Sequence, residues 1–171
     1  MRRRSLGFVV AFVVFVLDQL TKWWVLGPLQ LRQRVNGDTL GQIYVLPFFN
    51  LTYTENRGIS LGLFQASTEF WRWFLVAFTS AIAIGVAWWI AREKSRGDQL
   101  ALGMVLGGAI GNILDRSRLG YVVDFADLHF GGFRPFFIFN VGDAAISIGV
   151  VILSLRAFLI KERPKENAEH A

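Results

Sequence analysis

The sequence predicts an integral membrane protein, mainly α-helical, with four transmembrane helices and a small β-sheet in the first outer loop. Apolar residues make up 53% of the 171-residue chain, charged residues make up 18%, and the mean hydropathy is +0.42. A soluble domain needs more polar surface than this composition provides. In addition, long apolar stretches recur along the chain with basic residues beside them.

The apolar stretches define one membrane domain over 1–171. A bilayer core about 30 Å thick needs a helix of about 20 apolar residues. Four spans are expected, at about 6–26, 70–91, 99–114 and 141–160. Basic residues are more frequent beside the termini and between the second and third spans than in the loops at about 27–69 and 115–140. The positive-inside rule therefore predicts that both termini, including the tail 161–171, are cytoplasmic.

The first outer loop carries three β-prone runs, Gln42–Leu46, Phe48–Thr54 and Ile59–Phe64. The last two are joined by Glu55–Gly58, a turn-type sequence that predicts a hairpin. These runs are too apolar for a solvated linker, so we expect a small twisted sheet lying on the membrane surface. Ser67–Trp73 is expected to begin as a helix at head-group depth.

Composition also excludes several kinds of site. The chain has no cysteine, which removes disulfides, thiolate catalysis and cysteine metal sites. It has two histidines, of which His170 lies in the polar tail and His129 alone cannot build a zinc site. We therefore expect no metal and no cofactor. The net charge is +5, and many of the basic residues lie beside apolar spans. This placement indicates membrane lipids as partners rather than nucleic acid.

Ionisable groups and glycines inside the spans call for an explanation, because charges are costly there. Asp18 and Lys22 are four residues apart and share a helix face, which predicts an intramembrane ion pair tying the first span to its neighbours. Direct chemistry by this pair is the alternative. Gly103, Gly107 and Gly111 recur every four residues, which favours close helix packing. The same glycine face would also leave room for a substrate segment.

The outer end of the third span carries a second polar group. Gly108, Asn112, Asp115 and Arg116 fall at helical spacing and share one face. A structural cluster of Asp115 with Arg116 and a substrate-binding site are both consistent with this spacing.

Two further aspartates lie at an apolar-to-water boundary. Asp124 is embedded in apolar neighbours, and Asp143 begins the fourth span on a face shared with Asn140, Ala144 and Ser147. A carboxylate that merely complements the helix dipole is the alternative explanation of Asp143. Asp127, by contrast, is expected to be a surface carboxylate.

A pair of carboxylates at such a boundary suggests acid–base chemistry. At a separation of about 4 Å and an effective dielectric near 20, two ionised groups repel by roughly 4 kcal/mol. This corresponds to about three pK units, so the pair would share one proton. One carboxylate can then deprotonate a water while the other donates to a carbonyl oxygen. Peptide hydrolysis needs these two acts.

Several sequence blocks resemble the lipoprotein signal peptidases, also called signal peptidase II. The blocks occur in the family's order along nearly the whole chain: Asp18–Lys22, Asn50–Gly58, Gly107–Arg116, Val122–Phe125 and Phe139–Ala144. The resemblance implies four transmembrane helices with a periplasmic β-cradle. It also implies an aspartic endopeptidase of the bacterial inner membrane, with the active site toward the periplasmic or outer face.

The resemblance further implies the substrate and the roles of residues. The enzyme would cleave diacylglyceryl-modified prolipoproteins on the amino side of the lipidated cysteine, with Asp124 and Asp143 as the catalytic dyad. Family positions that line the site fall on Asn56, Gly108, Asn112, Arg116, Asn140 and Ala144. The protein would act as a monomer, and the cyclic peptide antibiotic globomycin would inhibit it.

A small proton- or ion-coupled transporter is the principal alternative, because intramembrane carboxylates also mark ion paths. Such a path needs polar groups across the whole membrane. Here Asp124, Asp143, Asn112 and Arg116 are all expected at the outer end, and only Asp18 is a deeper acidic residue. The clustering favours hydrolysis over conduction.

Overall fold

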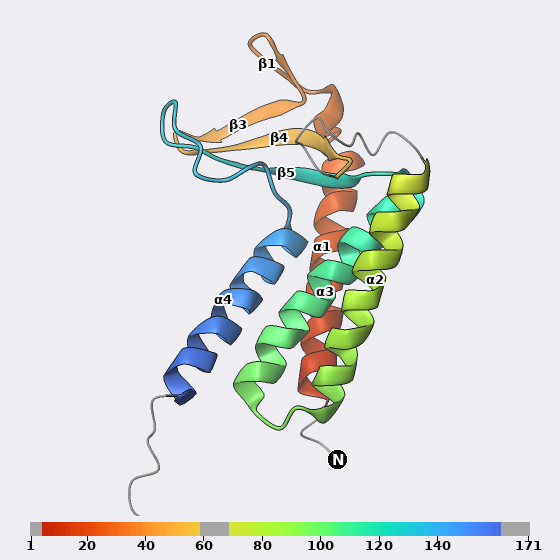
Figure 1. Cartoon of the computed structure of the whole chain (residues 1–171). Helices are drawn as coiled ribbons and strands as arrows, with labels where there is room; N and C mark the ends of the chain where they lie inside the picture. Colours follow the sequence, from red (N-terminus) through yellow and green to blue (C-terminus); the bar gives the residue numbers. More distant parts are fainter. Residues whose placement is uncertain (1–4, 59–68, 162–171) are drawn as a thin grey trace, which may run out of the picture.

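A computed structural model of the chain describes residues 5–58 and 69–161. It is mainly helical, and its long helices are α1 (Leu6–Leu26), α2 (Glu69–Arg92), α3 (Arg96–Leu119) and α4 (Val141–Lys161). An antiparallel sheet lies across one end of these helices, while α1 begins and α4 ends at the opposite end (Figure 1). This arrangement brings both outer segments of the chain together over the same end of the bundle.

Within the described residues, three helices are long and apolar enough to cross a membrane, namely α1, α2 and α4. α3 is less apolar because it carries the glycine stripe and has charged residues near both ends. It packs against all three other helices and lies at the centre of the bundle. A helix so enclosed presents little surface to lipid, so it tolerates a lower apolar content. α3 also continues to Leu119, so Asp115 and Arg116 belong to the helix rather than to a loop.

The glycine stripe of α3 faces α1. A Cβ atom added to Gly103 or Gly107 would collide with the backbone of α1, and one added to Gly111 would collide with the Asp18 carboxylate. The prediction of close helix packing is therefore correct. The alternative that this face leaves room for a substrate segment is wrong, because α1 already fills the space.

Two arginines near helix ends tie neighbouring helices together. Arg72 of α2 donates from Nε to the carbonyl of Arg116 at 2.8 Å and from Nη2 to that of Ser117 at 2.6 Å. It thereby satisfies carbonyls at the C-terminal end of α3, which a cation also complements electrostatically. At the other end of the bundle, Arg156 of α4 contacts Asp98 of α3, with Nε 2.6 Å from Oδ1.

The sheet has the strand order β3 (Gln42–Leu46), β4 (Phe49–Asn56), β5 (Val122–Leu128), and all pairs are antiparallel. The prediction of β3 and β4 is confirmed, but β4 continues through Asn56, where a turn was expected. β5 was not predicted, because two aspartates interrupt the run of apolar residues that would indicate a buried strand. The predicted strand Ile59–Phe64 and residues 67–68 lie outside the described residues.

Smaller elements complete the outer part of the chain. The 3-10 turn η1 (Leu31–Gln33) follows α1, and β1 (Val35–Asn36) pairs with β2 (Thr39–Leu40). Beneath the three-stranded sheet, Val25 and Leu31 pack with Phe125 and Ala126 of β5 in one buried cluster. This packing fixes β5 against the end of α1, and β5 carries the first of the two aspartates.

The expectation that Asp127 is a surface carboxylate is wrong. Its side chain is 1% exposed, because β5 is covered on both faces. Thr52 of the neighbouring strand donates from Oγ1 to Oδ2 of Asp127 at 3.0 Å, and Arg134 approaches the same oxygen to 3.3 Å. Asp127 is therefore a buried, paired acid that connects the sheet to the segment between β5 and α4.

Candidate active site

Asp124 lies in β5 and is almost fully buried, with 2% of the residue exposed. The pairing of β4 with β5 brings Asn56 beside it, and Nδ2 of Asn56 lies 3.0 Å from Oδ2 of Asp124. On the other side, Nδ2 of Asn140 lies 2.7 Å from Oδ1. Both carboxylate oxygens of Asp124 therefore accept a hydrogen bond from a side-chain amide.

Asp143 lies in the first turn of α4, where it forms a reciprocal cap with Asn140. The backbone N–H of Asp143 donates to Oδ1 of Asn140 at 2.9 Å, and the backbone N–H of Asn140 approaches Oδ2 of Asp143 to 3.3 Å. This is a capping-box arrangement, so the interpretation of Asp143 as a helix N-terminal carboxylate is correct in itself. However, Asp143 also accepts a bond from Nδ2 of Asn112 of α3 at 2.8 Å.

Asn140 joins the two aspartates, because its side-chain nitrogen contacts Asp124 and its backbone contacts Asp143. Burial and the nearby charge of Asp143 raise the pKa of Asp124 to about 7, against the lowering effect of Asn56, Asn140 and Lys22. Two carboxyl groups in this relationship favour a state with one proton between them. The more buried Asp124 is the favoured holder of that proton.

A buried ion cluster lies directly behind the two aspartates. Lys22 of α1 contacts Oδ2 of Asp18 at 2.8 Å and Oδ2 of Asp115 at 2.9 Å, and we call these three residues the Lys22 cluster. The expected pairing of Asp18 with Lys22 is therefore present. Asp115 was expected with Arg116 or at a substrate site, and it instead faces α1. The Nζ atom of Lys22 also lies 3.1 Å from Oδ1 of Asn112.

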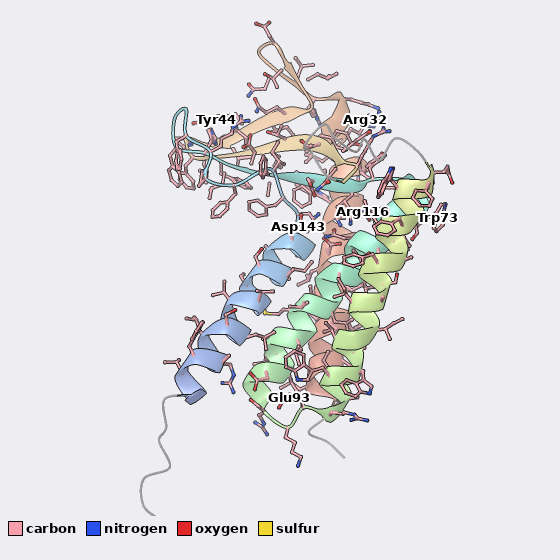
Figure 2. The ribbon with its side chains drawn as sticks, in the orientation of Figure 1. Arg32, Tyr44, Trp73, Glu93, Arg116 and Asp143 are labelled. Atoms are coloured by element: carbon pink, nitrogen blue, oxygen red, sulfur yellow. The ribbon has the colours of Figure 1, made fainter. Side chains whose placement is uncertain are left out.

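The remaining expected site residues differ in what surrounds them. A Cβ atom on Gly108 would collide with the carbonyl of Gly142, so Gly108 permits the close approach of α3 and α4. Arg116 lies near the end of the bundle that also holds Asp143 (Figure 2). Its Nε atom is buried and has no hydrogen-bond partner among the described residues, while the charges of Asp124 and Asp143 act on it. A buried, unpaired guanidinium nitrogen can donate to an incoming group.

Two open cavities meet at the aspartates. One, of about 740 Å³, includes Asp124 and Asn56 in its lining, and the other, of about 520 Å³, includes Asp143, Ala144 and Asn56. The segment 136–138, with Phe136 as its first residue, lines both. Sequence reasoning missed this wall, although its run of apolar residues in a loop is a signal that could have indicated it. An extended chain that crossed from one cavity to the other would pass both carboxyl groups.

Comparison with known proteins identifies the family of the chain. A family model described as signal peptidase (SPase) II matches residues 10–159. The lipoprotein signal peptidase of Rhizorhabdus wittichii is 54% identical over 98% of this chain and 93% of its own length. The chain belongs to the signal peptidase II family.

Other signal peptidase II relatives and solved structures extend the likeness. The lipoprotein signal peptidase of Sphingopyxis alaskensis is 55% identical over 92% of this chain and 87% of its own length. A solved structure of a bacterial membrane enzyme, determined by the in meso method, is 27% identical with a TM-score of 0.75 and covers 96% of this chain and 94% of its own. A second such structure has 29% identity and a TM-score of 0.72. Together with the apolar helices, these likenesses identify a multi-pass membrane protein that is a protease by family.

Proposed function

We propose that this member of the signal peptidase II family is an aspartic endopeptidase that removes the signal peptide from diacylglyceryl-modified bacterial prolipoproteins. Cleavage would occur on the amino side of the lipidated cysteine. The observation that carries the aspartic mechanism is that Asn140 contacts both Asp124 and Asp143 at the junction of two cavities. No other pair of carboxyl groups among the described residues lines these cavities with the same support.

The environments of the two aspartates assign their roles. Asp124 has a pKa raised to about 7 by burial and by the charge of Asp143, so it holds the proton at the start of the reaction. Asn112 and the backbone of Asn140 donate hydrogen bonds to Asp143, and the N-terminus of α4 favours an anion at this position. Asp143 is therefore the general base, and Asp124 is the general acid.

The reaction then follows from these protonation states. Asp143 removes a proton from a water molecule, whose oxygen forms a bond to the carbonyl carbon of the peptide before the lipidated cysteine. Asp124 donates its proton to the carbonyl oxygen, which gives a neutral tetrahedral intermediate. When the C–N bond breaks, the proton held by Asp143 passes to the leaving amino group. Asp124 recovers a proton from the intermediate as the new carboxyl group forms.

Other residues of the site contact the substrate or hold the two aspartates in place. The buried Nε of Arg116 has no partner among the described residues, so a carbonyl group of the extended substrate can accept its hydrogen bond. Asn56 and Asn112 hold the dyad through Asp124 and Asp143, respectively. Ala144 leaves space in the cavity beside Asp143, where a larger side chain would meet the substrate.

The cavities suggest how a lipidated substrate lies across the dyad. The cavity beside Asp143 reaches Ile148 of α4, on the side of the apolar helices, and suits the signal peptide. The cavity beside Asp124 opens toward β4 and carries Arg57 and Arg134 at its margin, where the polar chain beyond the cysteine can lie. Among the described residues, the two aspartates and the amides that support them gather at one end of the bundle, whereas a transporter needs polar groups across the whole membrane.

The same proposal fixes the orientation in the membrane. All four long helices cross the bacterial inner membrane, α3 included, because its place among the other three limits its contact with lipid. Both termini are cytoplasmic, and the sheet lies at the periplasmic surface as the cradle of the site. The enzyme acts as a monomer surrounded by membrane lipids, and globomycin binds at the dyad as an inhibitor.

Cleavage of a synthetic lipopeptide by purified protein tests the proposal. Asp124→Asn and Asp143→Asn should each abolish turnover while leaving membrane insertion and thermal stability close to parental. Asp38→Asn is the control, since Asp38 is an exposed acid of the same outer part of the chain and lies outside both cavities. The aspartic mechanism is wrong if both dyad variants cleave at the parental rate. Equal turnover of lipidated and unlipidated peptide would contradict the lipid-dependent substrate.

A further inference from the structure

We propose that Lys22 is a positioning residue for the cleavage reaction, because the Lys22 cluster holds the backbone and side-chain groups that set the geometry of the dyad. This inference rests on the proposed roles of Asp124 and Asp143. It goes beyond a structural ion pair between Asp18 and Lys22, whose only effect would be on the stability of the bundle.

The first step concerns the orientation of the Asn112 amide. Nζ of Lys22 is buried and can only donate hydrogen bonds, so the Asn112 atom 3.1 Å away must be the oxygen. A planar amide with its oxygen turned to Lys22 has its nitrogen turned away, and that nitrogen lies 2.8 Å from Oδ1 of Asp143. Lys22 therefore determines that Asn112 presents an N–H, rather than a carbonyl, to the base.

The same orientation reaches the other aspartate. The oxygen of Asn112 also accepts from Nδ2 of Asn140 at 3.2 Å, and this nitrogen lies 2.7 Å from Oδ1 of Asp124. A flipped Asn112 would place its nitrogen against two donors, Lys22 and Asn140, and its oxygen against the Asp143 carboxylate. All three contacts would be repulsive, so the lysine selects one arrangement of the two amides.

The second step concerns the backbone just before each aspartate. Oδ1 of Asp18 accepts from the N–H of Gly142 at 2.9 Å, and Oδ2 of Asp115 accepts from the N–H of Val123 at 3.2 Å. Gly142 precedes Asp143, and Val123 precedes Asp124. Lys22 contacts Oδ2 of Asp18, which is not the oxygen bound to Gly142, and Oδ2 of Asp115, which is the oxygen bound to Val123. It therefore joins the two backbone anchors through one charged group.

Burial makes the lysine necessary for this arrangement. Asp18 is fully buried and Asp115 is 5% exposed, and two buried carboxylates without a cation would repel each other and lose their solvation. Lys22 is also one of the charges acting on Asp124. The charged groups that face the dyad or line its cavities are Lys22, Asp18, Asp115, Arg116, Glu55, Arg57 and Arg134. Replacing Lys22 by a neutral residue removes one positive charge from this set and leaves Asp18 and Asp115 without their cation.

The test compares Lys22→Met with Arg156→Met in purified, membrane-inserted protein. Both substitutions remove a cation that ties two helices, but Arg156 near the end of α4 contacts Asp98 near the start of α3, away from the dyad. Both variants should lose thermal stability. Only Lys22→Met should lower kcat, by about tenfold to a hundredfold as expected for a misplaced charged hydrogen bond, with KM changed much less. Its activity profile should also move to higher pH, since removal of a cation disfavours ionised Asp124.

Lys22→Met leaves two unpaired carboxylates, so a second variant keeps the test decisive if that protein does not fold. Lys22→Met combined with Asp115→Asn keeps the formal charge of the cluster at −1, because it removes one positive and one negative charge together. It should fold and still show the lowered kcat, because Asn112 then lacks the cation that holds its oxygen. A folded protein without Lys22 that keeps the parental kcat and pH profile would overturn the inference. Failure of the parental protein to cleave would instead contradict the proposed function.

Discussion

Nδ2 of Asn140 lies 2.7 Å from Oδ1 of Asp124, and this contact is the side-chain link between the strand and the helix that carry the two aspartates. The backbone of Asn140 meanwhile belongs to the cap of α4, with Oδ1 of its side chain 2.9 Å from the N–H of Asp143. One residue therefore serves both as a helix cap and as the connection between the acid and the base.

These two roles of Asn140 are separable by substitution. Asn140→Ala should lower kcat at least tenfold and also lower stability by about 1 kcal/mol through loss of the cap. Asn140→Ser keeps a capping oxygen but cannot reach Asp124 with a donor amide, so it should lower kcat similarly with little loss of stability. Lipopeptide cleavage and thermal unfolding in detergent measure the two effects. Full activity of the serine variant would show that the contact with Asp124 is dispensable.

The raised pKa of Asp124 predicts the alkaline side of the pH profile. The proposed general acid is active when protonated, so kcat/KM should fall as the pH rises through about 7 and the shared proton is lost. Asn56 lowers this pKa by donating to the ionised carboxylate. Asn56→Ala should therefore raise the pKa and move the alkaline limb to higher pH. Movement to lower pH would contradict the assignment of Asp124 as the acid.

The same pKa also predicts a dependence of stability on pH. A carboxyl group whose pKa is raised on folding binds more protons in the folded state than in the unfolded state. Between about 4 and about 7, the contribution of Asp124 to the free energy of unfolding should therefore decrease as the pH rises. Asp124→Asn should flatten this part of the stability curve, which pH-dependent thermal unfolding of the two proteins measures directly.

Close packing of α3 against α1 predicts opposite effects at two helical glycines. A Cβ atom on Gly107 would collide with the backbone of Ala11, so Gly107→Ala should destabilise the protein by about 1–3 kcal/mol. Gly85 of α2 has open space around the corresponding position, and Gly85→Ala should be neutral or slightly stabilising. Thermal unfolding compares them. Equal stability of the two variants would mean that α1 and α3 do not meet at Gly107.

The contact of buried Asp127 with the exposed Arg134 side chain predicts an effect on substrate binding. Arg134 lies two residues before Phe136, the start of the apolar wall between the cavities, and its Nη2 atom approaches Asp127 to 3.3 Å. Asp127→Ala removes this tie and the bond from Thr52, so it should lower stability and raise KM for the lipopeptide by several-fold.

Asp38, an exposed acid of the turn between β1 and β2, is the control for Asp127. Asp38→Ala should change neither stability nor KM, because its carboxylate is solvated. If the two alanine variants have the same KM, Asp127 does not position the wall.

The cavity beside Asp143 predicts a steric effect of Ala144. Ala144→Leu should fill part of the space of about 520 Å³ and raise KM at least tenfold while the dyad stays intact. Ala157→Leu enlarges an exposed position of the same helix and should leave cleavage unchanged. Steady-state kinetics separates these outcomes. An unchanged KM in the Ala144 variant would place the signal peptide elsewhere.

The sequence by itself determined the features that depend on local pattern and on solvent. Apolar length predicted the helices, of which α1 begins and ends where expected, at Leu6 and Leu26. The spacing of Asp18 and Lys22 predicted their pairing, since residues four apart on a helix must be neighbours. The ordered motif blocks indicated the signal peptidase II family, because they cover nearly the whole chain.

Only the tertiary structure decided which distant groups meet. β4 and β5 are far apart in the sequence, so no local pattern predicts that they pair. This pairing buries Asp127 and brings Asn56 to Asp124. Asp115 contacts Lys22 of another helix rather than its neighbour Arg116, because spacing along one helix defines a face but not the helix that packs against it. The relation of Asp124 to Asp143 through Asn140 is likewise a product of packing, since a strand and a helix end must be held together before their carboxyl groups can act as a pair.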